Sequence, residues 1–447
     1  MSRRSFAQVA PPPLVVAIVL LLSSSGSAFA QASAPTGNAS APAGNASPAA
    51  NASQQATPAD EPEGFLSEPG FITSIINLAN QFGEQDSGTP KAGFYPEMSN
   101  MLTGSGWLAI GPGYRNYFAN DRGLFEASAA VSWHLYTMGQ ARVEARDLAD
   151  GHLRLGTQVI WQDNTQVNFF GIGPDVVDAD QSQYQIQTHD FVGYATVTSK
   201  EWLTWGGRFG WLGHPKVMNP GGTFKPNVPS TLVAFPNDPA VSLSEQPALL
   251  HSEAAIAADT RNHRGHPTRG FLYRGALTNY WDRTYGTFTF HTWEAEGLQY
   301  VPLAGARVVL AFHAWTVQSN PGPEHEIPFY LLPSIGGNRV LRSYHTFEFH
   351  DNNLLSLQAE SRFALFTHVD LALLADAGNV APNFGGLNLD KTGYGAGVRL
   401  HTEKTTLARL DVAKGSQGWH VVFSTTEPFR LPRTRTRREN ALIPFAP

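Results

Sequence analysis

The chain of 447 residues lacks cysteine, carries few charges and offers no long apolar run beyond its first thirty residues. Without cysteine there can be no disulfide framework, thiol chemistry or cysteine-ligated metal. Charged residues make up 15%, and the formal charge of −6 becomes −8 when the two charges of Arg3 and Arg4 are removed, so nucleic acid is not an expected partner. A transmembrane helix needs ~18 consecutive apolar residues, and we expect none in the mature protein.

Residues 1–30 have the three parts of a secretory signal peptide. Arg3 and Arg4 form the charged start, Leu14–Leu22 the apolar run, and Ala28–Ala30 the small-residue cleavage site. An uncleaved anchor helix is the alternative, but this run is too short to span a membrane. The sequence therefore predicts export.

A low-complexity segment and a short helix follow. Residues 31–63 repeat Asn-Ala-Ser three times; these are formal glycosylation acceptors, or simply a flexible linker. In the short segment 64–92, apolar residues recur at helical spacing over 70–82. If the chain that follows forms a membrane barrel, such a periplasmic amphipathic helix could plug the lumen of the barrel, lie on the inner leaflet of the membrane or act as a linker.

From about residue 93 onward the chain alternates between apolar and polar residues. In Leu355–Phe363 and His368–Gly378 the odd positions are mostly aliphatic, whereas Glu360 and Asp376 stand at even positions. A period of two places the two sets on opposite faces of a strand. Apolar side chains toward lipid and charges toward a polar lumen are typical of a transmembrane β-barrel.

Sixteen strands are predicted from this alternation and from the loop lengths. Fifteen segments alternate clearly: 107–118, 124–136, 140–148, 152–168, 184–200, 201–212, 248–259, 270–282, 286–301, 305–318, 353–364, 367–378, 393–402, 404–414 and 417–427. Bacterial barrels have an even strand number, with long loops outside, which places one further strand at 93–103. This strand contains Pro96, which cannot donate to a ladder, so we expect a weak seam between the first and last strands.

The side-chain faces follow from the same period. We expect outward side chains at Phe125, Ala127, Ala129, Val131, Trp133, Leu135, Tyr394, Ala396, Val398, Leu400, Trp419, Val421 and Phe423, and lumenal ones at Glu126, Ser128, Ser132, His134, Arg399 and His401.

A loop motif precedes the strand that carries Glu360. It reads Gly336-Gly337-x-x-x-Leu341-Arg342-Ser343-Tyr344. With Glu360 and Asp376 further on, it resembles the signature of the BamA/TamA superfamily of outer-membrane barrels (bacterial surface antigen family). That resemblance implies that the loop folds from outside into the lumen and that Arg342 meets both acids. Ser343 stands where the family usually has glycine, which would be costly if a positive φ were required there.

The resemblance covers about residues 94–429 and adds further family elements, Asp259–Arg261, Pro267–Gly270 and Gly395-x-Gly397-x-Arg399. It implies that the last strand runs through Phe423 toward a terminal aromatic, Phe429, at the seam. About 60 residues separate the cleavage site from the barrel, too few for a polypeptide-transport-associated domain, so we expect a bare barrel (93–429). Residues 430–447 are predicted to be a basic periplasmic tail that is either solvated or in contact with anionic lipid.

We find no catalytic or cofactor signature. His263, His266, His345 and His350 lack the spacing of a metal motif, and Asp370 and Asp376 would lie about 20 Å apart along one strand. We therefore expect no enzyme, cofactor or metal site.

The function that the resemblance implies is insertion or transport of protein or lipid clients through the barrel seam, in the outer membrane of a Gram-negative bacterium. A passive channel and a purely structural surface protein remain alternatives. Expected partners are outer-membrane lipids and unfolded outer-membrane proteins, and the barrel is expected to be monomeric.

Overall fold

The computed structural model describes residues 64–83, 92–99, 109–221, 227–425 and 427–429. The predicted signal peptide (1–30), linker (31–63) and basic tail (430–447) lie outside these residues. Within them, no helix is long and apolar enough to cross a membrane.

Sixteen long strands make up most of the described chain. They are β1 (Gly93–Ser99), β2 (Ala109–Phe118), β3 (Gly123–Ser132), β4 (Thr137–Leu148), β5 (Leu153–Phe169), β6 (Ser182–Lys200), β7 (Leu203–Leu212), β9 (Leu249–Asp259), β10 (Gly270–Asp282), β11 (Phe290–Leu303), β12 (Val308–Asn320), β15 (Asn353–Phe366), β16 (Val369–Ala381), β17 (Lys391–His401), β18 (Thr406–Gly415) and β19 (Gly418–Ser424).

Short elements occupy the connections. They are the strands β8 (Lys216–Met218), β13 (Ser334–Ile335) and β14 (Phe349–His350), the helices α2 (Gly70–Gly83) and α3 (Thr231–Ala234), and the 3-10 turns η3 (Asp178–Asp180), η4 (Phe329–Leu331) and η5 (Phe384–Gly386). β8 pairs with β6, and β13 pairs with β14.

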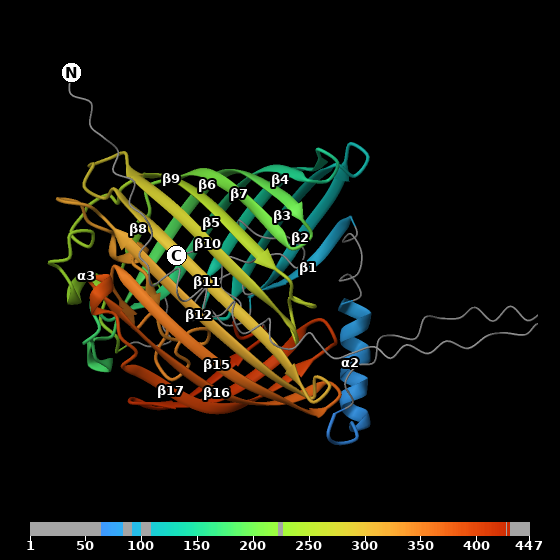
Figure 1. Cartoon of the computed structure of the whole chain (residues 1–447). Helices are drawn as coiled ribbons and strands as arrows, with labels where there is room; N and C mark the ends of the chain where they lie inside the picture. The colour runs from blue at the N-terminus through green and yellow to red at the C-terminus, as the bar shows by residue number, and fades with distance from the viewer. Residues whose placement is uncertain (1–63, 84–91, 100–108, 222–226, 426, 430–447) are drawn as a thin grey trace, which may run out of the picture.

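Each long strand pairs antiparallel with the next one along the chain, from β1–β2 to β18–β19. The sheet curls into a barrel, with α3 at one end and α2 at the other (Figure 1). The predicted sixteen-stranded antiparallel barrel is confirmed. Of the predicted first strand, the part up to Ser99 is present, and residues 100–103 lie outside the described residues.

The two faces of the sheet differ as the period of two predicts. On β17, Tyr394 and Val398 are exposed while Arg399 and His401 are buried, and on β19 the outward Trp419, Val421 and Phe423 are all exposed. On β3 the predicted alternation holds from Phe125 to Ser132. Trp133 and Leu135 are exposed as well, but they lie in the β3–β4 turn.

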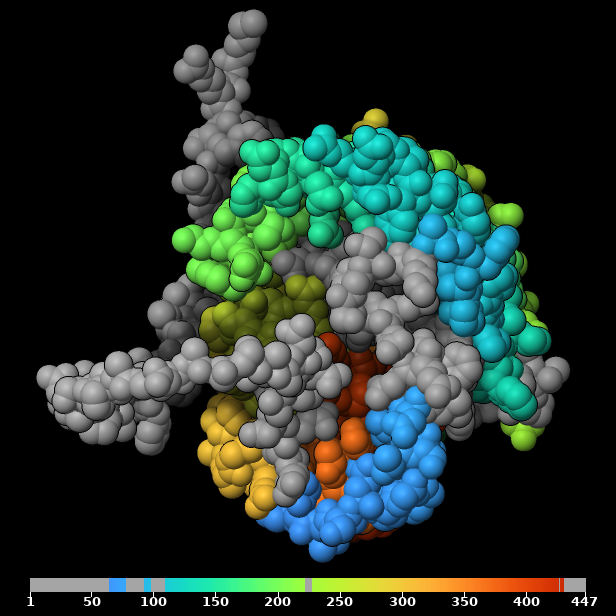
Figure 2. Space-filling model, turned by 90° about the vertical axis from the view of Figure 1, so that its right-hand side faces the viewer, coloured from blue at the N-terminus to red at the C-terminus, as the bar shows by residue number. Residues whose placement is uncertain are grey.

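The helix α2 packs on the outer side of the barrel rim. Ile72 and Ile76 are buried against Val369 and Leu400, which share the outward parity of the exposed Leu371 and Val398 on their own strands. Viewed from this end, α2 lies along the rim beside the orange and red strands (Figure 2). This placement contradicts the possibility that α2 plugs the lumen.

Two connections fill the lumen at the opposite end. Phe329, Tyr330 and Leu332 from the β12–β15 connection form one buried apolar cluster with Ala240 of the β7–β9 connection. Inward side chains of the wall, such as Tyr184, complete this cluster, with the Phe329 and Tyr184 ring centroids 4.9 Å apart. The barrel is therefore a filled structure at this end.

The topology predicts that this filled end faces the outside. Asn237 lies between β7 and β9, Asn388 lies between β16 and β17, and both are exposed. Because the chain contains no cysteine, a single cysteine at either position should react with an impermeant maleimide in intact cells. Protection of both positions, with labelling only after lysis, would contradict this orientation.

Candidate functional site

The connection between β12 and β15 turns into the barrel. Leu341 and Tyr344 are buried with Phe349 against Leu354 and Val380, which lie on the lumenal faces of β15 and β16. Residues 336–348 of this connection, called the inserted loop below, thereby reach the wall of the lumen.

Two glycines shape the tip of the inserted loop. Gly336 and Gly337 have φ of +117° and +103°, a region that other residues rarely adopt. A Cβ on Gly336 would lie 2.2 Å from the carbonyl oxygen of His345. The amides of Gly336 and Gly337 donate to the carbonyls of Val340 and Leu341 at 3.2 and 3.3 Å. The glycine pair thus closes a tight turn that presents Arg342 to the wall.

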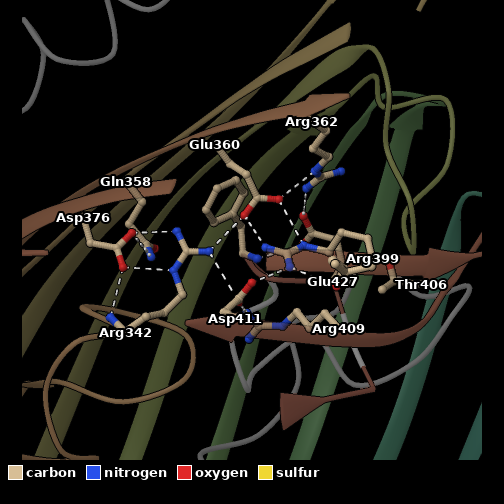
Figure 3. A network of polar contacts seen from close by, with 12 residues as sticks. Arg342, Gln358, Glu360, Arg362, Asp376, Arg399, Thr406, Arg409, Asp411 and Glu427 are labelled. Atoms are coloured by element: carbon tan, nitrogen blue, oxygen red, sulfur yellow. Dashed lines mark hydrogen bonds and ion pairs between the residues drawn. The ribbon is translucent and has the colours of Figure 1, made fainter. Parts of the chain in front are cut away.

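Arg342 lies between the two acids that the motif suggested (Figure 3). Its Nε and Nη2 donate to Asp376 Oδ2 and Oδ1 at 2.9 and 2.7 Å, and Nη1 donates to Glu360 Oε2 at 2.9 Å. Its backbone amide also donates to Asp376 Oδ2, at 2.9 Å. Burial by itself would lower the pKa of Arg342, but Asp376 and Glu360 raise it above its ordinary value. The guanidinium is therefore charged and is bound by two carboxylates, those of Asp376 and Glu360.

The arginine belongs to a larger network of buried charges, called the tether network below. Glu360 also accepts hydrogen bonds from Arg362 Nε at 2.9 Å and from Arg399 Nη2 at 2.8 Å. Asp411 contacts Arg399, accepts from Arg409 Nη1 at 2.6 Å, and lies 3.7 Å from Arg342 Nη1. Arg362 Nη2 donates to Glu427 Oε1 at 3.1 Å. The members are Arg342, Glu360, Arg362, Asp376, Arg399, Arg409, Asp411 and Glu427.

The tether network is electrically neutral and shielded from water. Its four arginines face four carboxylates, and each of the eight residues is at most 3% exposed. Buried charges are expensive unless paired, and removing one partner of a buried pair costs about 3–5 kcal/mol. The inserted loop supplies only Arg342 among these charges, so its withdrawal would leave an excess of negative charge on the wall.

Five members of the network were not singled out as site residues from the sequence, namely Arg362, Arg399, Arg409, Asp411 and Glu427. Arg399 belongs to the element Gly395-x-Gly397-x-Arg399, and its inward parity was predicted, whereas Arg362 lies within the alternating segment Leu355–Phe363. A count of inward charges on β15–β18 could have found Asp411 and Arg409. Nothing local marked Glu427, because it lies beyond the last strand.

Ser343 does not occupy a left-handed conformation, so the cost considered for a serine here does not arise; the positive φ of 56° belongs to Leu341. Instead, the Ser343 side chain is fully buried against two strand glycines. A Cβ on Gly393 or Gly415 would lie 2.1 or 2.5 Å from Ser343 Oγ. Glycines on β17 and β18 therefore make room for the larger loop residue.

The inserted loop also contacts the turn between β18 and β19. Tyr344 Oη lies 3.1 Å from Ser416 Oγ, and Gln417 Nε2 donates to Glu348. β19 is the last strand of the sheet, so the loop is connected to the hairpin at one end of the strand series.

The three residues assigned to the seam behave differently. Pro96 lies on β1 and Phe423 on β19, the two end strands. Phe429 is not at the seam, which corrects that assignment. The last strand ends at Ser424, and Phe429 is buried with Leu298 and Tyr300 on the lumenal side of the wall. The chain turns inward because Glu427 accepts hydrogen bonds from Tyr300 and Arg362.

Comparisons with known proteins identify a family domain and a fold. Residues 219–423 match the Omp85 superfamily domain. The structure is similar to that of BamA from Haemophilus ducreyi lacking POTRA domains 1–3, with a TM-score of 0.54 and 14% identity, covering 80% of this chain and 81% of that one. No curated protein sequence matches the chain.

Two further solved structures share less of their length with this chain. CdiB from Acinetobacter baumannii has a TM-score of 0.44 and 10% identity, covering 71% of this chain and 56% of that one. CdiB from Escherichia coli has a TM-score of 0.45 and 12% identity, covering 74% and 60%.

The contact between Ser343 and the strand glycines predicts a reciprocal pair of variants. Gly393→Ala should destabilise the folded barrel by about 1–3 kcal/mol, because its methyl group would overlap Ser343 Oγ. Adding Ser343→Gly should restore most of the loss, as measured by urea unfolding in detergent. Gly275→Ala is the matched control, since a Cβ there meets nothing within 4 Å. Equal losses in the single and double variants would show that the two sites are uncoupled.

Proposed function

Because the chain carries an Omp85 superfamily domain, we propose that it is an outer-membrane assembly or translocation barrel that inserts or transports protein or lipid clients through its seam. An Omp85 domain on a BamA-like barrel fold implies the outer membrane of a Gram-negative bacterium. The observation that carries the proposal is the inserted loop, which is held by the tether network next to the strands that lead to the seam.

The end strands of the sheet support a weak seam. β19 has seven residues, whereas the fourteen long strands from β2 to β18 have ten or more, and the structure describes seven residues of β1. Among the described residues, the pairings run from β1 to β19 and none joins these two strands. Fewer possible ladder bonds at this place would let the barrel part there at lower cost than elsewhere.

A proline on β1 weakens the same edge. Pro96 pairs with Pro112 of β2. Neither residue has an N–H, so this must be a non-hydrogen-bonded pair, in which both backbone nitrogens point away from each other. The nitrogen of Pro112 then faces β3, where the register has no partner for Gly111 or Pro112. The nitrogen of Pro96 faces the seam, which lacks a donor there.

The inserted loop is placed to influence that edge. Arg409 and Asp411 of the tether network are on β18, which pairs with β19. Tyr344 and Glu348 contact the β18–β19 turn. A client that displaced the loop would therefore remove contacts from the hairpin that borders the seam.

A passive channel is the second candidate, because a polar lumen is compatible with solute passage. The apolar cluster that fills one end of the lumen, with Phe329 and Tyr184 buried within it, argues against it. A purely structural surface protein would neither conduct solutes nor speed the insertion of clients. Conductance in planar bilayers without faster client insertion in liposomes would favour the channel, and the reverse result would favour the proposed function.

Arg342 provides the first test. Arg342→Ala should speed proteolysis within residues 321–352 and abolish insertion activity while heat-modifiable migration stays unchanged, because strand pairing does not need this contact. Arg342→Lys should keep only part of the insertion activity, since an ammonium cannot make the paired planar contacts.

Arg274→Ala is the matched control, because Arg274 also bridges two buried acids, Glu253 and Glu294, but on β10. If a Glu360→Gln/Asp376→Asn variant keeps the loop as protected as in the wild type, the tether interpretation is wrong.

Pro96 provides the second test. Pro96→Val adds an N–H toward the seam, and one hydrogen bond contributes about 1 kcal/mol, so client insertion into liposomes should slow by about fivefold. Pro112→Val adds the same group toward β3 and should leave the insertion rate near that of the wild type. Equal effects of the two substitutions would refute the assignment of the seam.

A further inference from the structure

Two histidines and one aspartate meet at the α2 end of the lumen, away from the inserted loop. His266 lies on the β9–β10 connection, Asp370 is the second residue of β16, and His401 ends β17. All three are buried, and one side-chain nitrogen or oxygen from each lies within 4.8 Å of the others. The proposed function uses none of these residues.

The hydrogen bonds fix which ring nitrogen of each histidine carries the proton. His401 Nδ1 lies 3.0 Å from the carbonyl oxygen of Thr402, and a carbonyl only accepts, so Nδ1 must donate. His266 Nδ1 lies 3.4 Å from Thr406 Oγ1, whose own hydrogen is donated to the Gly265 carbonyl at 3.0 Å. That hydroxyl therefore accepts from His266. In the neutral form, both histidines carry a lone pair on Nε2.

Both lone pairs face the same carboxylate. His401 Nε2 lies 3.4 Å from Asp370 Oδ1, and His266 Nε2 lies 3.6 Å from Asp370 Oδ2. His401 Nε2 is buried and has no hydrogen-bond partner among the residues that the structure describes. Three acceptors that converge in a buried place repel one another unless a cation lies between them.

We propose that His266, Asp370 and His401 bind one divalent transition-metal ion of the zinc type. Imidazole nitrogen and carboxylate oxygen are ligands of zinc at about 2.0–2.2 Å, and three protein ligands leave the fourth tetrahedral position to water. Ligands at such bond lengths are separated by roughly 3.4 Å in a tetrahedron, close to the two separations found. The imidazole rings are stacked, with centroids 3.7 Å apart, so each must rotate for its lone pair to point at a shared ion.

A proton is the rival occupant. An imidazolium on either ring would pair with Asp370 in place of the ion, so uptake of a metal ion distinguishes the two occupants. The two Nδ1–H donations also hold the rings in the tautomer that metal-binding histidines need.

The ion would connect the β9–β10 connection to β16 and β17. This connection is already joined to the tether network, because Arg362 Nη1 donates to the Pro267 carbonyl at 3.2 Å. A metal here would fix the α2 end of the barrel without touching the seam.

The test uses the purified mature chain, folded in detergent and freed of metal with a chelator. Titration with Co²⁺ should give one equivalent with the intense visible absorption of a tetrahedral nitrogen and oxygen site, and Zn²⁺ should displace it. Zn²⁺ should also raise the unfolding temperature of the wild type.

His401→Ala and Asp370→Asn should each weaken binding by more than about 100-fold. His325→Ala, in a half-buried loop position at the other end, is the matched control and should bind as the wild type does. A wild-type chain that takes up no cobalt and shows no zinc-dependent unfolding temperature would overturn the proposal, whatever the variants do. Undiminished binding by folded His401→Ala and Asp370→Asn chains would overturn it too.

Discussion

The contact between Arg342 and Asp376 is the interaction on which the rest of the site depends. A connection of more than thirty residues has to give up conformational entropy to lie inside a barrel, and the apolar packing of Leu341 and Tyr344 does not define its direction. The paired hydrogen bonds of one guanidinium to one carboxylate do so, because their planar geometry permits few orientations. Once Arg342 is placed, Leu341 before it and Tyr344 after it pack in the cluster that contains Leu354 of β15 and Val380 of β16.

The two acids do not depend on Arg342 equally. Glu360 also accepts hydrogen bonds from Arg362 and Arg399, whereas the other side-chain partner of Asp376 among the described residues is the neutral Gln358, at 3.2 Å. Loss of the loop would therefore leave Glu360 compensated and Asp376 exposed to the full cost of an unpaired buried charge. Asp376 therefore mainly binds the inserted loop to the wall, whereas Glu360 mainly links strands of the wall to one another.

Most of the fold could be predicted from the alternation of apolar and polar residues along the strands. Phe125–Ser132 and Tyr394–His401 could be assigned to faces because a period of two depends on local sequence and on burial alone. The loop motif suggested the meeting of Arg342, Glu360 and Asp376, whose contacts the structure contains. Phe429 could not be placed, because its inward turn depends on Tyr300 and Arg362, which are far away in sequence. For the same reason, no spacing could predict that His266 meets Asp370 and His401, and only the folded structure shows that Gly393 makes room for Ser343.

The central claim is that Asp376 holds the inserted loop in the lumen, and amide hydrogen exchange at Arg342 tests it most directly. The backbone N–H of Arg342 donates to Asp376 Oδ2, so its exchange reports the contact itself. We predict much faster exchange at Arg342 and through residues 336–344 in Asp376→Asn than in Glu360→Gln, with the exchange of the barrel strands unchanged in both. Slow exchange at Arg342 in Asp376→Asn, equal to that of the wild type, would contradict the account.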